Sequence, residues 1–253
     1  MFKTISAILL MGLVISVFPS CQNGSENKPQ VIPDTASKLV PAQVPLKEKV
    51  LTKAEQDALT PDTVIQRLKE GNRRYMNNDL TQRDHSALVR NASSGQYPKA
   101  VILSCVDSRV PVEDVFDKGI GDMFVGRIAG NFVNVDLLGS MEFGCKVSGA
   151  KLIVVMGHES CGAIKAAIDN VKLGNITAML TKIQPAVAKS QDFKGEKSSK
   201  NDEFVDYVGK NNVIVTIENI RKYSPILREM ADKGEIKIVG AYYNLKTGEV
   251  IFF

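Results

Sequence analysis

The sequence predicts an α/β domain with an N-terminal helical arm. Its central sheet is mainly parallel, has an antiparallel edge and is flanked by helices. Short apolar runs that suit buried strands recur along the chain, at residues 100–103, 123–128, 151–156 and 236–243. Stretches with helical spacing lie between them, at residues 137–145 and 163–171. Strands that alternate with helices are typical of a parallel sheet covered on both faces. The 253 residues, 44% of them hydrophobic, suit one globular domain with some additional chain.

The first twenty residues read as a secretory signal peptide. A single Lys3 precedes an apolar run of 14 residues, Ile5–Phe18, and Ser20 then precedes Cys21. A cysteine directly after a small residue resembles a bacterial lipoprotein processing site, so we expect export to the periplasmic side with a lipidated Cys21 as the membrane contact. An uncleaved membrane anchor is the alternative, although the run is shorter than the roughly 20 residues of a membrane-spanning helix.

Residues 21–50 are predicted to form a flexible tether. They hold four prolines and many polar residues, and they show no sustained helix or strand period. The expected organisation is therefore a lipoprotein-type signal peptide at residues 1–20, a proline-rich tether at 21–50 and a folded domain at 51–253.

The folded part is expected to begin with one or two helices and to end with a hairpin. A capping box at Thr52–Glu55 and a proline directly after Thr60 mark two helix starts. These helices, within residues 52–78, form the predicted arm. Residues 242–253 read as a hairpin that turns near 247–248, which places an antiparallel strand at one edge of the sheet.

Charge and composition argue against several classes of partner. The formal net charge is +4, from 32 basic and 28 acidic residues dispersed along the chain, which is too weak to indicate a nucleic-acid surface. The sequence has no glycine-rich phosphate loop followed by Lys-Ser or Lys-Thr. We therefore expect neither nucleic-acid binding nor a kinase or dinucleotide-binding function.

The motif SCVDSR, residues 104–109, comes directly after the first apolar run. In an extended chain alternate side chains share a face, so Cys105, Asp107 and Arg109 are expected to point the same way out of the end of a strand. Ligands of open α/β sheets collect outside the carboxyl ends of strands. The pattern therefore favours a chemical site, and the alternative is a buried cysteine beside a structural ion pair.

A second motif, GHESCG at residues 157–162, follows another apolar run and holds His158 and Cys161. With Cys105 these residues supply two thiolates and an imidazole, and Asp107 or a water is left for a fourth position. Nitrogen and sulfur donors with an exchangeable fourth ligand favour a catalytic Zn²⁺ site. A disulfide between Cys105 and Cys161 is the alternative in an oxidising compartment, but it would not account for His158 or Asp107.

The other cysteine and histidine of the folded part are expected to play no part in this site. Cys145 keeps helical spacing to Leu138 and reads as a small core residue. His85 lies in a polar stretch and reads as a surface residue rather than a proton shuttle.

Together the two motifs, about fifty residues apart, resemble the signature of the β-class carbonic anhydrases, which is Cys-x-Asp-Ser-Arg followed by His-x-x-Cys. Further similarity lies in residues 71–75, 121–131, 240–243 and 247–252, so only the leader falls outside it. The resemblance implies a catalytic domain at 51–253 that reversibly hydrates CO₂ to bicarbonate and a proton, on Zn²⁺ held by Cys105, His158 and Cys161.

The resemblance also implies roles for residues around the metal. In that family the aspartate of the first motif either binds zinc or pairs with the arginine and leaves the fourth position to water, and Asp107 and Arg109 match these two residues. Gln96 matches a glutamine that donates a hydrogen bond to CO₂ or bicarbonate. Phe124 matches an aromatic wall of the CO₂ pocket, and Gly162 matches a backbone N–H donor near the substrate.

A homodimer or tetramer is the implied assembly, because the family is built from dimers in which N-terminal helices embrace the neighbouring subunit and sites lie at the interface. One subclass binds bicarbonate at a second, inhibitory site that uses a tryptophan. This chain contains no tryptophan and keeps Gln96, so the simpler, non-allosteric subclass is expected.

Two other functions stay open at this point. Hydrolysis of a CO₂ analogue, carbonyl sulfide or carbon disulfide, uses the same ligands in relatives, and access to the pocket would distinguish it. The other is a non-catalytic zinc-binding lipoprotein. Asp107, Arg109 and Gln96 argue against that function, because metal storage needs none of them.

Overall fold

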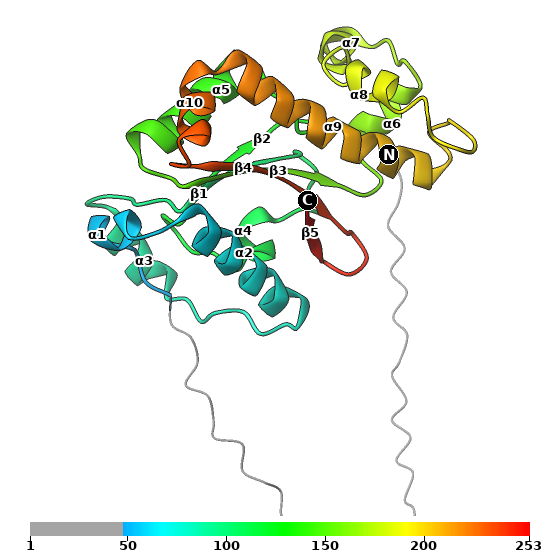
Figure 1. Ribbon diagram of the computed structural model, residues 1–253. Coiled ribbons are helices and arrows are strands. Elements are labelled where there is room, and N and C mark those ends of the chain that lie inside the picture. The colour runs from blue at the N-terminus through cyan, green and yellow to red at the C-terminus, as the bar shows by residue number, and fades with distance from the viewer. Residues whose placement is uncertain (1–47) are drawn as a thin grey trace, which may run out of the picture. The chain divides into compact units, whose positions relative to one another are not determined.

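The computed structural model describes residues 48–253 (Figure 1). The predicted signal peptide at 1–20, the lipidation candidate Cys21 and nearly all of the predicted tether lie outside the described residues. Within the described range, no helix combines the length and the apolar character that crossing a membrane requires.

A five-stranded sheet in the order β2-β1-β3-β4-β5 forms the centre of the domain. Its strands are β1 (Ala100–Ser104), β2 (Met123–Arg127), β3 (Leu152–His158), β4 (Lys237–Tyr243) and β5 (Val250–Phe252). The first four are parallel, and β5 runs antiparallel to β4 at one edge. The predicted mainly parallel sheet with an antiparallel edge is therefore confirmed.

Helices cover both faces of the sheet, with α1 to α4 on one face and α5, α9 and α10 on the other (Figure 1). The helices are α1 (Lys53–Asp57), α2 (Pro61–Met76), α3 (His85–Ala92), α4 (Val112–Val115), α5 (Val135–Glu142), the π-helical turn η1 (Phe143–Val147), α6 (Gly162–Ile168), α7 (Gly174–Leu180), α8 (Gln184–Lys189), α9 (Asp202–Tyr223) and α10 (Pro225–Asp232). Every residue of β1 and of β3 is buried, because both strands are covered on both faces.

The helices at the start of the folded part begin where the sequence predicts. The Thr52 hydroxyl accepts a hydrogen bond from the backbone N–H of Glu55, and the Glu55 side chain accepts from the N–H of Thr52, which completes the predicted capping box of α1. Thr60 caps α2 in the same way, with Pro61 at the first helical position.

Helix α2 packs closely against the segment that leads to β2. A Cβ added at Gly71 would lie 1.9 Å from the Phe116 carbonyl oxygen, so no larger residue fits there. Asn72 also ties α2 to the C-terminal hairpin, because its side-chain amide donates to Gly248 O at 2.8 Å and accepts from Val250 N at 2.8 Å. Helix α2 and the C-terminal hairpin are therefore held together by polar contacts.

Residues 172–235 carry no predicted element, yet the structure has four helices there, including α9, the longest of the described domain. Helix α9 crosses the sheet and also packs against α6 and α8. It therefore buries a wide face that includes polar residues such as Asn212 and Thr216. This mixture obscures the apolar period on which a prediction from sequence depends.

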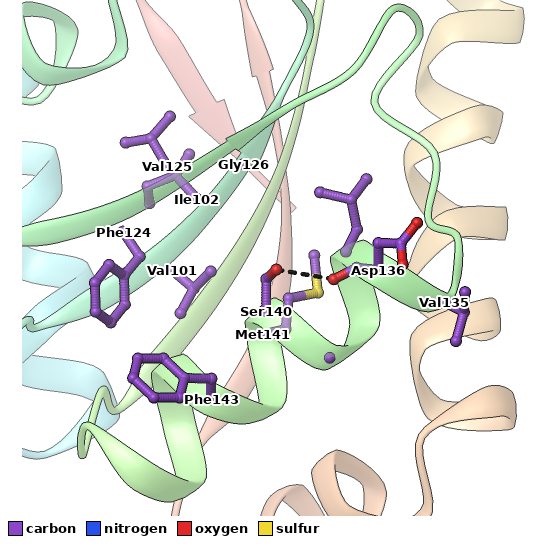
Figure 2. Close-up of a pocket in the computed structure, with 12 residues that line it drawn as sticks. Val101, Ile102, Phe124, Val125, Gly126, Val135, Asp136, Ser140, Met141 and Phe143 are labelled. Atoms are coloured by element: carbon purple, nitrogen blue, oxygen red, sulfur yellow. Dashed lines mark hydrogen bonds between the residues drawn. The ribbon is translucent and has the colours of Figure 1, made fainter.

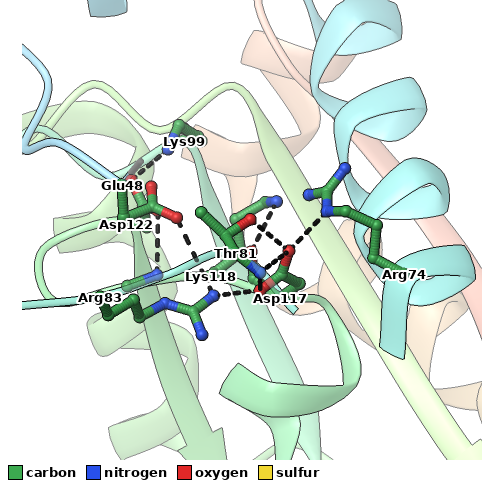
Figure 3. Close-up of polar contacts among 9 residues, drawn as sticks. Glu48, Arg74, Thr81, Arg83, Lys99, Asp117, Lys118 and Asp122 are labelled. Atoms are coloured by element: carbon green, nitrogen blue, oxygen red, sulfur yellow. Dashed lines mark hydrogen bonds and ion pairs between the residues drawn. The ribbon is translucent and has the colours of Figure 1, made fainter. Parts of the chain in front are cut away.

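A buried carboxylate, Asp117, ties the end of α2 and the segment that follows it, residues 81–83, to the domain (Figure 3). Its side chain is fully buried and accepts from Arg74 Nε at 2.6 Å, from Thr81 Oγ1 at 2.6 Å and from Arg83. Burial alone would raise the pKa of Asp117, but the hydrogen bonds from Thr81 and Arg74 and the charge of Arg83 outweigh it and hold the pKa below its ordinary value.

We expect Asp117→Asn to lower the free energy of unfolding by about 3–5 kcal/mol at pH 7, because the change leaves buried guanidinium groups without their counter-charge. Asparagine tolerates the positive φ of 48° at this position, so the variant changes the charge and not the backbone. Urea unfolding measures the difference. The control is Asp57→Asn in an exposed pair with Lys53, which should cost no more than about 0.5 kcal/mol.

The stabilisation by Asp117 should also depend on pH. The ordinary pKa of the group is 3.8, and the folded value is lower. The contribution is present above the ordinary pKa and is lost as the pH falls toward the folded one, since the unfolded chain then binds a proton that the folded chain does not. The difference in stability between wild type and Asp117→Asn should therefore shrink from pH 7 to pH 3. A difference that grows would contradict this assignment.

Candidate metal centre

Three side chains from three segments meet at the carboxyl edge of the sheet. Cys105 directly follows β1, His158 is the last residue of β3, and Cys161 precedes the first residue of α6. Their ligand atoms all lie within 4.8 Å of one another. The three residues are 4%, 1% and 2% exposed, so the cluster is closed off from bulk solvent.

The two sulfurs are placed for a shared cation and not for a covalent bond. Cys105 Sγ and Cys161 Sγ lie 4.0 Å apart, and both cysteines are free. A disulfide would hold them about 2.05 Å apart. Two thiolates on one tetrahedral Zn²⁺, with bonds of about 2.3 Å, would lie roughly 3.8 Å apart. The separation therefore fits the predicted metal site.

The tautomer of His158 follows from its neighbours. Nδ1 lies 2.8 Å from the backbone oxygen of Glu159, and because a carbonyl only accepts, Nδ1 must carry the hydrogen. The lone pair is then on Nε2, which is buried and has no hydrogen-bond partner among the described residues. An unpaired buried acceptor beside two thiols is the arrangement that a metal ligand requires.

The two thiols share one hydrogen bond. The bond from Cys161 lowers the pKa of Cys105 to about 4, with a smaller contribution from the N–H of Gly130. The same bond and burial raise the pKa of Cys161. The pair therefore favours one thiolate, and a bound dication would displace the proton of the other sulfur. Two thiolates and one imidazole are a donor set that zinc prefers.

Asp107 faces the cluster but is held by Arg109. Its carboxylate accepts from Arg109 Nε at 2.9 Å, Nη2 at 2.8 Å and the backbone N–H at 3.0 Å. These bonds hold the pKa of Asp107 well below its ordinary value. Asp107 Oδ2 also lies 3.8 Å from His158 Nε2. The carboxylate is therefore ionised beside the metal ligands, with its lone pairs mainly directed to the guanidinium.

The route by which Asp107 and Arg109 meet differs from the expected one. The extended alternation of residues 105–109 is wrong, because β1 ends at Ser104 and a turn occupies residues 108–109. The Asp107 carboxylate bonds to the N–H two residues later, which favours the turn over a longer strand.

Arg127 is a supporting residue that the sequence analysis missed. Its side chain reaches from the end of β2 and donates to the backbone oxygen of Cys105 at 2.9 Å and to that of Asp107 at 2.6 Å. It therefore fixes the loop that carries a metal donor and the carboxylate. Its position at the carboxyl end of a strand next to β1 was the available signal.

The structure places the three expected substrate-side residues in different parts of the domain. Gly162 is exposed and follows Cys161 directly, so its backbone is beside the cluster. Gln96 is exposed in the loop that enters β1, so it lies at the amino end of the strand that Cys105 follows. Since β1 has five residues with a rise of about 3.3 Å each, the amino end of the strand lies about 16 Å from the metal donors.

Phe124 also lies away from the metal donors of its own chain. It pairs with Val101 near the start of β1 and packs against Phe143 with ring centroids 6.1 Å apart. The two rings line an apolar cavity of about 620 Å³ along β2 (Figure 2). The structure thus brings Gly162 to the cluster, and it brings neither Gln96 nor Phe124 to the cluster of the same chain.

Comparison with known proteins agrees with the geometry. The carbonic anhydrase family model matches residues 100–250, more than half of this chain. Carbonic anhydrase 2 of Mycobacterium tuberculosis is 35% identical over 193 residues, which cover 73% of this chain and 88% of that relative.

Solved structures share the fold. The structure of the β-carbonic anhydrase CcaA has a TM-score of 0.60 at 24% identity, over 75% of this chain and 94% of that one. A structure of tetrameric β-carbonic anhydrases from the ascomycete Sordaria macrospora has a TM-score of 0.59 at 20% identity, over 66% of this chain and 86% of that one.

Cys161→Ser should lose bound zinc, because one of three protein donors to the metal is replaced by a poor ligand. The matched control is Cys145→Ser, which also changes a buried free cysteine but lies outside the cluster. Metal analysis of both purified variants should find close to one Zn²⁺ per chain in the control and almost none in Cys161→Ser. Full zinc occupancy in Cys161→Ser would refute the ligand assignment.

Proposed function

This chain belongs to the β class of the carbonic anhydrase family, and from that premise we propose that it reversibly hydrates CO₂ to bicarbonate and a proton, on Zn²⁺ held by Cys105, His158 and Cys161. The observation that carries this proposal is the convergence of two sulfurs and an unpaired imidazole nitrogen within 4.8 Å, beside the Asp107–Arg109 pair. The family uses zinc, and the donor set of the described residues fits that metal.

Zn²⁺ would supply a Lewis acid that makes water a nucleophile near neutral pH. Asp107 then has the task of accepting a hydrogen from the attacking water and so directing an oxygen lone pair toward the carbon of CO₂. Arg109 keeps Asp107 ionised and occupied by its three hydrogen bonds, which opposes ligation of the metal by the carboxylate. Gly162 is an exposed residue beside the cluster, and its backbone N–H is proposed to stabilise the negative charge that develops on the substrate oxygen.

A homo-oligomer completes this proposal, since Gln96 and Phe124 can serve a site only if it belongs to another copy. β2 is an edge strand whose outer side pairs with no described strand. The cavity beside it is lined by Phe124, and the nearby Val135, Phe143 and Val147 are 79%, 52% and 71% exposed. An apolar surface next to an unpaired strand edge favours association with a second copy.

Neither alternative function gains support from a specific observation. Hydrolysis of carbonyl sulfide or carbon disulfide would use the same three ligands, and the described residues offer nothing that favours it. A protein that only stores zinc has no need of the Asp107–Arg109 pair, in which three hydrogen bonds hold the carboxylate.

Export and lipidation are proposed on residues 1–21 alone. The signal-like segment and Cys21 support an anchored protein on the periplasmic side. Mass spectrometry of the mature N-terminus is the direct measurement, with a lipid-modified Cys21 expected as the first residue.

The proposed activity is tested by stopped-flow CO₂ hydration with zinc quantified in the same sample. Arg109→Ala should keep its zinc and lower kcat by about 100-fold, because Asp107 is no longer held in a productive orientation. The control is Arg90→Ala, which removes an exposed arginine of α3 and should leave both quantities unchanged. A fully zinc-loaded wild type without hydration activity would reject the proposed reaction, and carbonyl sulfide and carbon disulfide would be the next substrates.

Sharing of sites between copies is tested by complementation. Cys105→Ser lacks the metal, and Gln96→Leu lacks the donor that we assign to the neighbouring site, so each variant alone should be nearly inactive. Random co-assembly in dimers should restore about a quarter of wild-type activity, since half of the dimers are mixed and each holds one intact site. Activity that stays at the sum of the two separate variants would contradict sharing.

A further inference from the structure

Glu159 lies between the ligands His158 and Cys161, and all four of its polar groups are bonded. Its carbonyl accepts from His158 Nδ1 at 2.8 Å, and its N–H donates to Tyr243 O at 3.1 Å. Its carboxylate accepts from Asn244 Nδ2 at 2.8 Å and from Leu245 N at 3.1 Å. Three of the four bonds therefore join Glu159 to residues 243–245, and the fourth sets the tautomer of a metal ligand.

Residues 243–245 are themselves fixed. Asn244 Oδ1 accepts from the N–H groups of Lys246 and Thr247 at 2.8 and 2.9 Å, so the side chain that bonds to Glu159 also builds the turn between β4 and β5. Further along the same turn, Gly248 and Val250 are held to α2 by Asn72. Glu159 is thus tied to a rigid part of the domain.

The peptide unit between Glu159 and Ser160 is held at both ends. Its carbonyl points to His158, and its N–H donates to Asp206 Oδ1 of α9 at 3.3 Å. The same carboxylate oxygen accepts from the Tyr242 hydroxyl at 3.1 Å, which fixes Asp206. Two elements that are distant in sequence therefore determine the orientation of one peptide plane.

This orientation is strained at Ser160, whose φ is 49°. The left-handed region suits glycine and disfavours serine. A flip of the 159–160 peptide changes ψ of Glu159 and φ of Ser160 together, so it can return Ser160 to a negative φ while it reverses the direction of the Glu159 carbonyl. The flip would take the carbonyl away from His158, so the surrounding hydrogen bonds must oppose it.

We propose that Glu159 and Asp206 are positioning residues that lock the 159–160 peptide, so that its carbonyl holds His158 with Nε2 facing the metal. This inference rests on the proposed zinc site. It makes the β4–β5 hairpin and α9 part of the metal centre, although neither contributes a ligand.

The dissociation constant for Zn²⁺, measured by competition with a chelator under reducing conditions, tests the proposal without any activity assay. Glu159→Ala removes both bonds to residues 244–245 and should weaken zinc binding about 10- to 100-fold, the usual effect of losing a residue that orients a ligand. Asp206→Ala should act in the same direction. Asp206→Asn keeps an oxygen that accepts from Ser160 N–H and should bind zinc within about twofold of wild type.

A second-site change separates positioning from a loss of general stability. Ser160→Gly removes the cost of the left-handed backbone. The double variant should therefore bind zinc at least about fivefold more tightly than Glu159→Ala alone. The matched control is Asp117→Asn, which we expect to destabilise the arm side of the domain while leaving zinc affinity within about twofold of wild type.

Wild-type zinc affinity in Glu159→Ala would overturn the inference, and so would an affinity loss that Ser160→Gly does not reduce. A comparable loss in Asp117→Asn would also overturn it, because zinc retention would then follow overall stability. Failure of the proposed function has a different signature, since zinc would bind and respond to these variants while CO₂ hydration is absent. A wild-type protein that retains no Zn²⁺ would overturn both.

Discussion

The register between β1 and β3 is the constraint on which the metal centre depends. Ala100 pairs with Leu152 and Leu103 with Val155, so the two parallel strands run toward the same edge, where Cys105 follows β1 and His158 ends β3. A slip of one residue would shift one donor by about 3.3 Å, far more than a metal site tolerates. Burial of both strands on both faces resists such a slip, so the apolar core sets the geometry of the polar site.

Around the metal donors, polar groups from several elements hold backbone rather than ligand atoms. Arg127 binds the carbonyls of Cys105 and Asp107, Asp206 binds the N–H of Ser160, and the carboxylate of Glu159 ties its own turn to Asn244 and Leu245. Each contact crosses from one element to another, so metal affinity and folding are linked. The buried charges around Asp117 under the arm follow the same rule, because each is tolerated only while its partners are present.

The polar and apolar parts of the proposed reaction lie at different places on one chain. The metal donors and the Asp107–Arg109 pair are at the carboxyl ends of the strands. Phe124 lies on β2, the strand at the free side of the sheet, and Gln96 lies at the amino end of β1. Neutral CO₂ needs an apolar wall, and the donor cluster of a single chain has no contact with the wall expected at Phe124. The proposed oligomer resolves this, since an edge strand with exposed apolar neighbours can meet the donor cluster of a second copy.

The sequence by itself determined the buried strands β1 and β3, the capped start of α2, the closing hairpin and the grouping of Cys105 with His158 and Cys161, since continuous apolar runs, capping residues and closely spaced candidate ligands are local signals. Only the tertiary structure decided that Asp107 meets Arg109 through a turn, that Arg127 supports the loop, and that Glu159 joins the hairpin to His158. These contacts span up to 86 residues, between Glu159 and Leu245. The long-range contacts of Arg127 and Glu159 leave no local pattern, because they depend on strand register and on the packing of elements that are distant in the chain.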